Sequence, residues 1–361
     1  MKRLILGMAV VVVLVWVGTA RAGVNIITVP VGNLGNANDD TGYGRVDYAY
    51  NIGKYEVTAG QYTEFLNAVA ETDTYGLYST LMDHVSKGCQ ITRHGTSGSY
   101  TYDFSGGTVE VPGSTASDWE NRPVNYVGWG DAARFANWLH NGKPTGAQDL
   151  TTTEDGAYFL NGATTDEALL AVTREADWKW AIPTENEWYK AAYHKNDGVT
   201  GNYFHYPTSS DTPPGYIDDS GNFSRTGDGS FTEGGTDPGN YATYNGDGGI
   251  DGIGSPYYRN EVGEHENSVS PYGTFDQGGN LWDWTEGIYY DSYRNVRGGW
   301  FDSHDGHLHA SHRDGYYPTY EDVGPILGFR VASVPEPGSI TLLVCGALGL
   351  LTYAWRRRRL S

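Results

Sequence analysis

Apolar residues recur with a helical period early in the chain. Tyr62, Phe65, Leu66 and Val69 have the three- and four-residue spacing that places side chains on one face of a helix. Thr58 precedes them at the position of an N-cap residue. The pattern predicts an amphipathic helix packed on a core, and the stretch that begins at residue 42 and leads into it is typical of a strand.

Two later segments show the same signal. Near the middle of the first half, Asp131 is a candidate N-cap, and a helix is expected to end near Asn141 and Gly142. Thr184 followed by Glu187 has the spacing of a capping box and predicts a further helix. The residues expected to face the core in the first of these helices are Ala132, Phe135, Ala136 and Leu139.

Outside these helices the chain shows no sustained period. Residues 71–120 contain polar Ser, Gly, Thr and Tyr runs that are typical of hairpins or a large loop, and residues 207–239 have the composition of a long loop. Residues 240–334 show only short strand signals. Because there is no internal repeat and no second apolar core beyond a linker, we predict a single α+β domain with much irregular structure.

Apolar runs lie near both ends of the chain. Residues 1–22 begin with two basic residues, continue with an apolar stretch and end in an Ala-x-Ala cleavage pattern, which predicts a secretory signal peptide. A short N-terminal membrane anchor is the alternative. Residues 338–355 are just long enough to span a bilayer, and the arginines that follow would hold this end in the cytoplasm. Both ends predict that the middle of the chain lies outside the inner membrane.

The C-terminal segment has a three-part arrangement. Pro335, Glu336 and Pro337 precede the apolar run, and the arginines 356–359 follow it. This arrangement resembles the bacterial PEP-CTERM sorting signal. The resemblance implies that residues 335–361 are a sorting signal, that an exosortase-type protease is a partner, and that the helix contacts the membrane. A plain C-terminal anchor is the alternative.

Charge and cysteine content exclude several classes of protein. The chain has 24 Lys and Arg against 44 Asp and Glu, a net charge of −20. Without the three basic residues of 1–22, and without the four arginines and one glutamate of 335–361, the middle carries −26. Such a chain is no nucleic-acid binder, whereas it attracts cations such as calcium. Cys345 lies in the terminal helix, so Cys89 has no partner for an internal disulfide.

Six sequence blocks occur in a fixed order over about residues 42–332. They resemble the formylglycine-generating enzyme, or sulfatase-modifying factor, family, whose marks include a VTxxQY segment, a GNxWEW block, an RGG segment and a final GFR. The resemblance implies one α+β domain over residues 23–334, related to C-type lectins and poor in regular secondary structure. The blocks are IGKYEVTAGQYTEFLN, RPVNYVGWGDAARFANWL, IPTENEWYKAA, SPYGTFDQGGNLWDWTEG, VRGGWF and GFRVAS.

Most residues of these blocks are interpreted as structural. Glu185 and Glu187 are expected to cap a helix. Arg297, Arg313 and Arg330 are expected to tie loops together through bidentate hydrogen bonds, which an irregular fold needs in place of strand pairing. The tryptophans expected in the core are Trp129, Trp138, Trp188, Trp282, Trp284 and Trp300.

The chemistry implied by the family meets an obstacle in this sequence. Catalytic members oxidise a substrate cysteine with two cysteines that bind copper(I), between the RGG segment and the final GFR. Here the corresponding positions fall near Asp305 and Ala310, and the interval contains no cysteine. Soft thiolates suit Cu(I), and Cys89 lies in a different block and cannot replace a pair. We therefore do not expect formylglycine synthesis.

The same interval is rich in histidine. If Leu308 lies on a strand, His307 and His309 point to one face, and their imidazoles would suit Zn, Cu, Fe or Ni. Related non-haem iron sulfoxide synthases take their iron ligands mostly from a domain that this chain lacks. The alternative is that His304, His307, His309 and His312 are surface residues of a polar loop.

The family resemblance also implies structural calcium. Carried over by motif, one site would use Asp276 and Asp283 with the carbonyl oxygens of Gly279 and Leu281. Asp283 stands where the family often has Glu. Hard oxygen ligands on Gly-rich turns are what Ca²⁺ requires, although Asp and Asn in turns can instead bond only the backbone.

A further calcium site is expected ahead of these residues. It would use Asn240 and Asp251 with nearby carbonyl oxygens. This assignment follows the same family resemblance, and turn formation is again the alternative.

Two classes of function follow. The first is a non-catalytic, calcium-stabilised binding or structural module displayed outside the cell, with a glycan or extracellular polymer as the candidate partner. The alternative is an oxidoreductase of the formylglycine-generating or non-haem iron class with a histidine-based metal site. Fold resemblance alone does not decide between them.

Overall fold

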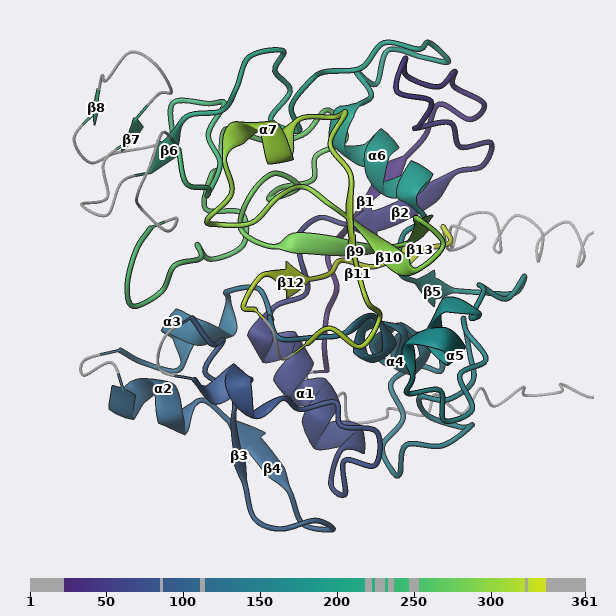
Figure 1. The fold of residues 1–361 in the computed structure, drawn as a ribbon, viewed down its shortest axis with the longest axis vertical. Helices are drawn as coiled ribbons and strands as arrows, with labels where there is room; N and C mark the ends of the chain where they lie inside the picture. Colours follow the sequence, from purple (N-terminus) through teal and green to yellow (C-terminus); the bar gives the residue numbers. More distant parts are fainter. Residues whose placement is uncertain are drawn as a thin grey trace, which may run out of the picture.

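The computed structural model describes residues 23–84, 87–110, 114–217, 223–224, 231–232, 237–246, 253–321 and 324–335 (Figure 1). The helices are α1 (Ala59–Val69), α2 (Ser105–Glu110), α3 (Ser117–Glu120), α4 (Trp129–His140), α5 (Asp166–Leu170), α6 (Glu185–Tyr193), α7 (Asp305–Leu308) and the 3₁₀ helix η1 (Thr80–Asp83). The strands are β1 (Thr28–Val31), β2 (Tyr50–Gly53), β3 (Thr92–His94), β4 (Thr101–Asp103), β5 (Trp180–Ala181), β6 (Tyr216–Ile217), β7 (Phe223–Ser224), β8 (Phe231–Thr232), β9 (Trp282–Tyr289), β10 (Tyr293–Arg297), β11 (Asp314–Tyr316), β12 (Leu327–Gly328) and β13 (Ala332–Ser333).

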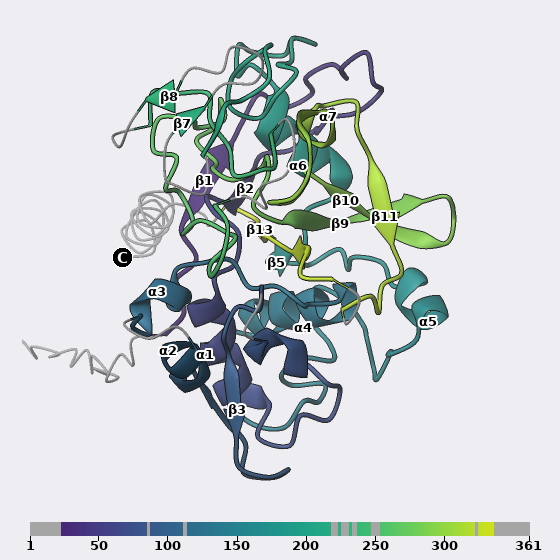
Figure 2. The same cartoon turned by 60° about the vertical axis from the view of Figure 1, so that its left-hand side comes forward.

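Two four-stranded sheets organise the fold. The first has the strand order β1-β2-β13-β5, so strands from the two ends of the domain pair directly. The second has the order β11-β10-β9-β12, in which β12 runs parallel to β9 and the other pairs are antiparallel. Figures 1 and 2 show α1 to α4 and the hairpin β3–β4 on one side of these sheets, with α6 and α7 on the other. The chain is therefore a helical half joined to a sheet-rich half.

The helix starts follow the signals in the sequence. The Thr58 hydroxyl accepts a hydrogen bond from the Gln61 N–H at 3.2 Å, and the Gln61 side chain accepts from the Thr58 N–H at 3.0 Å. Thr184 and Glu187 form the predicted capping box at α6. Both predicted N-caps are confirmed because a side-chain oxygen satisfies a backbone donor that the helix leaves free.

Helix α4 corrects one detail. Its N-cap is Gly128, and Asp131 stands three residues later, where its Oδ2 accepts from the Gly128 N–H at 2.8 Å. The prediction of Asp131 as the N-cap is wrong, because its carboxylate reaches back from the first turn to the N–H of the N-cap residue. The predicted end is confirmed, with Asn141 as the C-cap and Gly142 at a φ of +80°.

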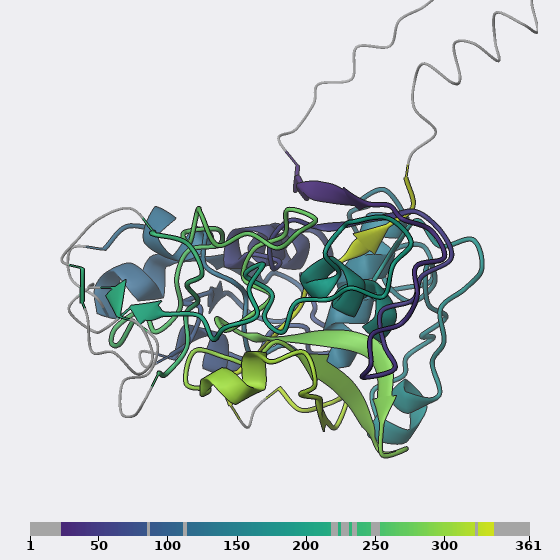
Figure 3. The same cartoon turned by 90° about the horizontal axis from the view of Figure 1, so that it is seen from above.

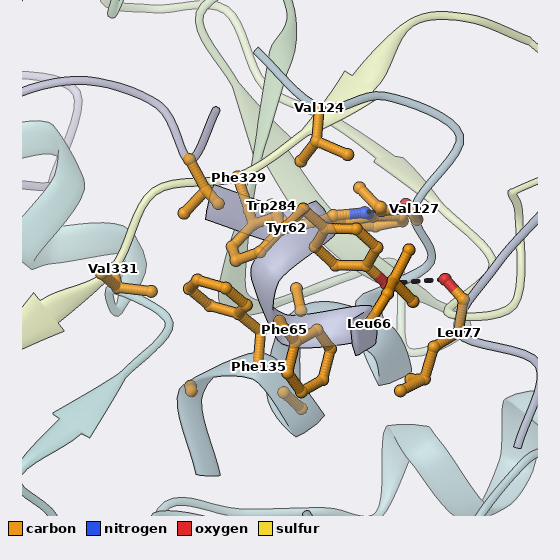
Figure 4. Packing of buried hydrophobic residues seen from close by; sticks show 14 of the residues in the cluster. Tyr62, Phe65, Leu66, Leu77, Val124, Val127, Phe135, Trp284, Phe329 and Val331 are labelled. Carbon is orange, nitrogen blue, oxygen red and sulfur yellow. Dashed lines mark hydrogen bonds between the residues drawn. The ribbon is translucent and has the colours of Figure 1, made fainter. Parts of the chain in front are cut away.

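Aromatic side chains fill the core between α1 and α4 (Figure 4). The rings of Tyr62 and Phe135 are stacked with centroids 6.1 Å apart, and Phe65 and Phe329 meet Phe135 edge-on at 5.3 and 5.4 Å. The Tyr62 hydroxyl donates to the Leu77 carbonyl at 2.8 Å, which satisfies its one polar atom. Five of the six tryptophans predicted in the core are at most 3% exposed, and Trp300 is half-buried.

All three predicted arginines tie distant segments together, but only Arg313 makes the predicted bidentate hydrogen bonds. Arg313 binds the Glu185 carboxylate with two hydrogen bonds of 2.6 and 2.7 Å, and Arg297 donates to the same carboxylate at 2.9 Å. Arg330 donates to Asp283 at 2.6 Å. The capping role predicted for Glu185 is wrong, because both of its oxygens are used by these arginines, while Glu187 does cap α6.

The irregular stretches contain more structure than their sequences indicate. Residues 71–120 include the predicted hairpin, β3–β4, but also η1, α2 and α3. The segment predicted as a long loop contributes β6, β7 and β8 to a three-stranded sheet. Strand β9 spans eight residues, and its first four are buried on both faces. That double burial removes the alternation of polar and apolar residues by which a strand is recognised.

Within the described residues, no helix combines the length and the apolar character needed to cross a membrane. The predicted signal peptide, residues 1–22, and the predicted terminal helix, residues 338–355, lie outside the described residues.

Candidate functional site

Asp283 on β9 lies at the centre of the candidate calcium site. Its Oδ2 accepts hydrogen bonds from Arg330 Nε at 2.6 Å and from Trp188 Nε1 at 2.8 Å, and all three side chains are at most 1% exposed. Its Oδ1 is equally buried but receives no hydrogen bond from the described residues. A buried polar atom without a partner costs about 1–3 kcal/mol. This oxygen is therefore available to a cation.

The other predicted ligands of this site lie in the turn that leads into β9. Gly279 has a φ of +81°, and a Cβ there would come within 2.1 Å of the Thr243 carbonyl oxygen, so only glycine fits. The carbonyl oxygens of Gly279 and Leu281 receive no hydrogen bond within the described part of the chain. Asp276 Oδ2 accepts from the Gly263 N–H at 2.7 Å, and burial raises the pKa of this carboxyl to about 6.

Glu56 joins this group, although the sequence analysis did not identify it. It is 2% exposed, and it accepts hydrogen bonds from the Leu281 N–H at 3.1 Å and from Asn280 Nδ2 at 3.0 Å. Burial, and then the charges of Asp283 and Asp276, raise its pKa well above the usual range. The one available signal was a single acid in the short segment that leads from a strand into a helix.

Glu56, Asp276 and Asp283 are called the carboxylate cluster below. When all three are ionised, Arg330 pairs with Asp283 and the buried Arg259 interacts with the charge of Glu56, which leaves at least one carboxylate charge unbalanced, and burying such a charge is costly. A proton or a bound cation would balance that charge. No three His, Cys, Asp or Glu side chains of the described residues converge closely enough to hold a metal ion by themselves. The predicted calcium site differs in that it also uses two backbone carbonyl oxygens.

The other predicted calcium site lies only partly within the described residues. Asn240 has a φ of +59°. Its Oδ1 accepts from the Thr208 hydroxyl at 2.6 Å, and its Nδ2 donates to the Pro213 carbonyl at 3.2 Å. The side chain therefore joins two loops. Asp251, the second predicted ligand, lies outside the described residues.

The positions of the family's copper-binding cysteines hold no thiolate. Asp305 begins α7, and its carboxylate accepts from the Gly306 N–H at 2.8 Å. Ala310 is 2% exposed, and its N–H donates to the His205 carbonyl at 2.8 Å. Cys89, the one cysteine of the described part of the chain, is fully buried in the core, and burial raises the pKa of its thiol. These residues do not fit a thiolate copper site.

The histidine segment is not a strand. Leu308 ends α7, and the two histidines on either side of it belong to separate ring groups. The ring of His307 contacts those of His304 and His312, with centroids 4.1 and 4.6 Å apart, whereas the ring of His309 contacts that of His205 at 5.1 Å. The structure thus does not bring His307 and His309 together, because the turn at the buried Leu308 replaces the expected strand.

A cavity of about 900 Å³ lies beside β1, β13 and the end of α4. Figure 3 shows β1 (purple) and β13 (yellow) on the side of the molecule opposite to α7. Lys143, Lys179 and His140 line the cavity together with the half-buried Trp180 and the exposed Asn141. None of its lining residues is acidic, which sets it apart from the negative charge of the whole domain.

Several solved structures are similar to this chain in fold. Treponema denticola variable protein 1 is 19% identical, with 87% of this chain and 97% of that chain covered and a TM-score of 0.46. CarF is 16% identical, with 86% and 99% covered and a TM-score of 0.48. PvdO from Pseudomonas aeruginosa is 15% identical, with 87% and 92% covered and a TM-score of 0.42. Comparison with curated proteins gives no match.

Two family models match the sequence. The sulfatase-modifying factor enzyme 1-like domain matches residues 18–334, which confirms the predicted family and the predicted α+β, irregular domain. The PEP-CTERM protein-sorting motif matches residues 333–359 and implies recognition by an exosortase-type sorting system. The chain therefore belongs to the sulfatase-modifying factor enzyme 1-like domain family and carries a PEP-CTERM motif that directs its export and sorting towards the cell surface.

Proposed function

We propose that this chain is a non-catalytic binding module that is stabilised by calcium and displayed outside the cytoplasm. The observation that carries the proposal is the replacement of the family's cysteine pair by Asp305 and Ala310. Cys89 cannot take over the role, because it is fully buried in the core between other elements. Without a thiolate pair, the family's oxidation of a substrate cysteine has no site in this domain.

The carboxylate cluster is the proposed main calcium site. Asp283 Oδ1 and the carbonyl oxygens of Gly279 and Leu281 are hard ligands with no hydrogen-bond partner among the described residues. A divalent cation there would also offset the charges of Asp276 and Glu56, which otherwise have to be protonated. Asn240 and Asp251 are proposed for the further calcium site on the basis of the family resemblance.

A glycan or extracellular polymer is the proposed ligand, and the cavity beside β1 and β13 is its proposed site. The volume of about 900 Å³ lies in the range of ligand pockets, roughly 300–1,000 Å³. Trp180 offers a ring for a sugar to pack against, while Asn141 and Lys179 offer hydrogen bonds to hydroxyl and carboxyl groups. Because none of its lining residues is acidic, the cavity should repel an acidic polymer less than the negatively charged domain as a whole does.

Display outside the cytoplasm rests on the two ends of the chain. We propose that residues 1–22 are removed as a signal peptide and that residues 338–355 hold the chain in the membrane until an exosortase-type protease acts at the sorting motif. Strand β2 pairs with both β1 and β13, so the two ends of the domain lie in one sheet.

Metal analysis combined with an activity assay tests the proposal. The full chain is purified without chelator and with a tag free of histidine, and it is assayed for formylglycine formation on a cysteine-containing sulfatase peptide. We expect about one or two equivalents of calcium and no product. Formylglycine formation by the purified chain would contradict the non-catalytic role, and a chain free of calcium would contradict the stabilising role.

Ligand binding needs its own test. The same preparation is screened on a glycan array and against extracellular polymer, beside the variant Trp180→Ala. We expect the unchanged chain to bind one of these ligands and the variant to bind it more weakly, since the indole ring would no longer support a sugar. Equal retention by both proteins would contradict the cavity as the binding site.

An oxidoreductase remains the second candidate function. The observation that favours it is the group of three histidine rings next to the positions of the absent cysteines. Oxygen consumption that depends on both a bound redox metal and a thiol peptide would support this candidate. A metal-loaded chain without oxygen consumption would contradict it.

A further inference from the structure

Two histidine rings that contact each other each carry a buried nitrogen without a partner. His307 Nδ1 and His312 Nε2 are inaccessible to solvent and make no hydrogen bond within the described structure. Their rings meet at a centroid distance of 4.6 Å and an angle of 64°. Each such atom costs about 1–3 kcal/mol if nothing binds it. Two unpartnered nitrogens on neighbouring rings favour a ligand at this place.

We infer that His307 and His312 bind a late first-row transition metal ion, copper or zinc, with His304 as the third ligand. Imidazole nitrogens suit both metals. His304 stacks on His307 at 4.1 Å, its side chain is 65% exposed, and its Nδ1 lies 3.9 Å from Asp305 Oδ1. No three ligating side chains of the described residues converge as they stand, so the proposed site requires the His304 ring to turn towards the ion.

The backbone that carries the two buried ligands is held firmly. Leu308 is fully buried, and its carbonyl accepts from the Tyr193 hydroxyl at 3.0 Å. The His312 carbonyl accepts from Arg297, a buried side chain that is itself fixed by Glu185. Metal sites need ligands that the surrounding structure already positions, and here the structure positions His307 and His312.

A buried tryptophan borders the two rings. The ring of Trp282, which is 1% exposed, lies 5.7 Å from that of His307 and 5.6 Å from that of His312. The two proposed ligands therefore pack on the core of the domain through one shared neighbour.

This site deepens the second candidate function, which rests on the same three histidines, and is independent of the proposed binding function and of the calcium site. Its ligands are nitrogens of His304, His307 and His312, none of which stands at the cysteine positions Asp305 and Ala310. Calcium prefers oxygen ligands, so excess calcium does not compete for it. A failure of the calcium proposal would leave this inference untouched.

Competition titration tests the inference. The full chain in detergent, with a histidine-free tag, is freed of metal, saturated with calcium and titrated against a chromophoric chelator with Zn²⁺ or, without oxygen, with Cu⁺. We expect one equivalent of either metal per chain. His307→Ala and His312→Ala should each weaken binding about tenfold or more, and His304→Ala should weaken it less.

His309→Ala is the matched control. It removes a histidine from the same segment, but the ring of His309 contacts His205 and Tyr206 instead of the proposed ligands. The His309→Ala variant should bind metal with the same affinity as the unchanged chain. Thermal unfolding without metal shows which variants fold. If His312→Ala does not fold, His312→Gln is used in its place.

X-ray absorption of the zinc-loaded chain then counts the imidazole ligands independently of any variant, and at least two are expected. Absence of stoichiometric binding would overturn the inference. Unchanged affinity in the His307 and His312 variants, or an equal loss in His309→Ala, would overturn it as well.

Discussion

The helical half and the sheet-rich half of this molecule are stabilised in different ways. Between α1 and α4, side chains such as Tyr62, Phe65 and Phe135 exclude water and pack ring against ring. Buried charge is also balanced differently in the two halves. On α4, the buried Arg134 pairs with Glu154 at 2.7 Å, whereas around β9 Arg330 faces more carboxylates than it can neutralise. We therefore expect the first half to be stable through its own packing, and we propose that protons or a bound cation stabilise the second.

The largest expected effect comes from the packed half. Phe135→Ala removes a fully buried ring that contacts Tyr62, Phe65 and Phe329, so it should lower the free energy of unfolding by about 3–5 kcal/mol. Chemical denaturation measures this loss. The loss should be the same in calcium and in chelator, and a clear dependence on calcium would break the proposed division between the two halves.

Arg330→Met tests the sheet-rich half and should lower the free energy of unfolding by a similar amount. The Arg330 side chain is fully buried on Asp283, and removing one partner of a buried ion pair costs about 3–5 kcal/mol. The matched control is Arg45→Met, since Arg45 pairs with Asp47 at 3.0 Å but both side chains are more than half exposed. The control should change the free energy of unfolding by about 0.5 kcal/mol at most. Equal effects of the two variants would show that the buried charges do not stabilise the sheet-rich half.

A smaller effect is expected from pH at His265, which borders the carboxylate cluster. Its side chain is 4% exposed, and Nε2 lies 3.0 Å from the Thr243 hydroxyl and 3.2 Å from Asn260 Nδ2. Burial lowers its pKa to about 4. As the pH falls, the unfolded chain therefore takes up a proton at His265 before the folded chain does. The free energy of unfolding should fall by roughly 2 kcal/mol between pH 7 and pH 5 for this reason.

Chemical denaturation of the chain and of His265→Gln at pH 7 and pH 5 measures this contribution. The unchanged chain should lose more stability between the two pH values than the variant does. The same loss in both proteins would place the acid sensitivity elsewhere.

The sequence predicted the helical half better than the sheet-rich half for a physical reason. Thr58 caps α1 together with Gln61, three residues later, and Phe135 follows the helical period of its own segment, so both are visible along the chain. Glu56, by contrast, binds the N–H of a residue 225 positions later, and no local pattern reveals such a pair. Asp283 was predicted through the family resemblance, but its pairing with Arg330 emerged only from the fold.

The histidines illustrate the same limit on a shorter scale. The sequence indicated a metal-binding character but paired His307 with His309, because a strand was assumed at Leu308. A single helical turn in place of that strand brings His307 beside His304 and His312. The local backbone therefore decides which histidines lie together, and the order of residue types along the chain does not reveal it.

Thermal unfolding with and without calcium tests the central claim most directly. The chain and its variant Asp283→Asn are compared in calcium and in EGTA. Calcium that binds only the folded state must raise the melting temperature. We expect EGTA to lower the melting temperature of the unchanged chain. The variant Asp283→Asn should be less stable in both conditions, and its melting temperature should be nearly the same in calcium and in EGTA. An unchanged chain that melts at one temperature in calcium and in EGTA would contradict the claim that a cation balances the carboxylate cluster.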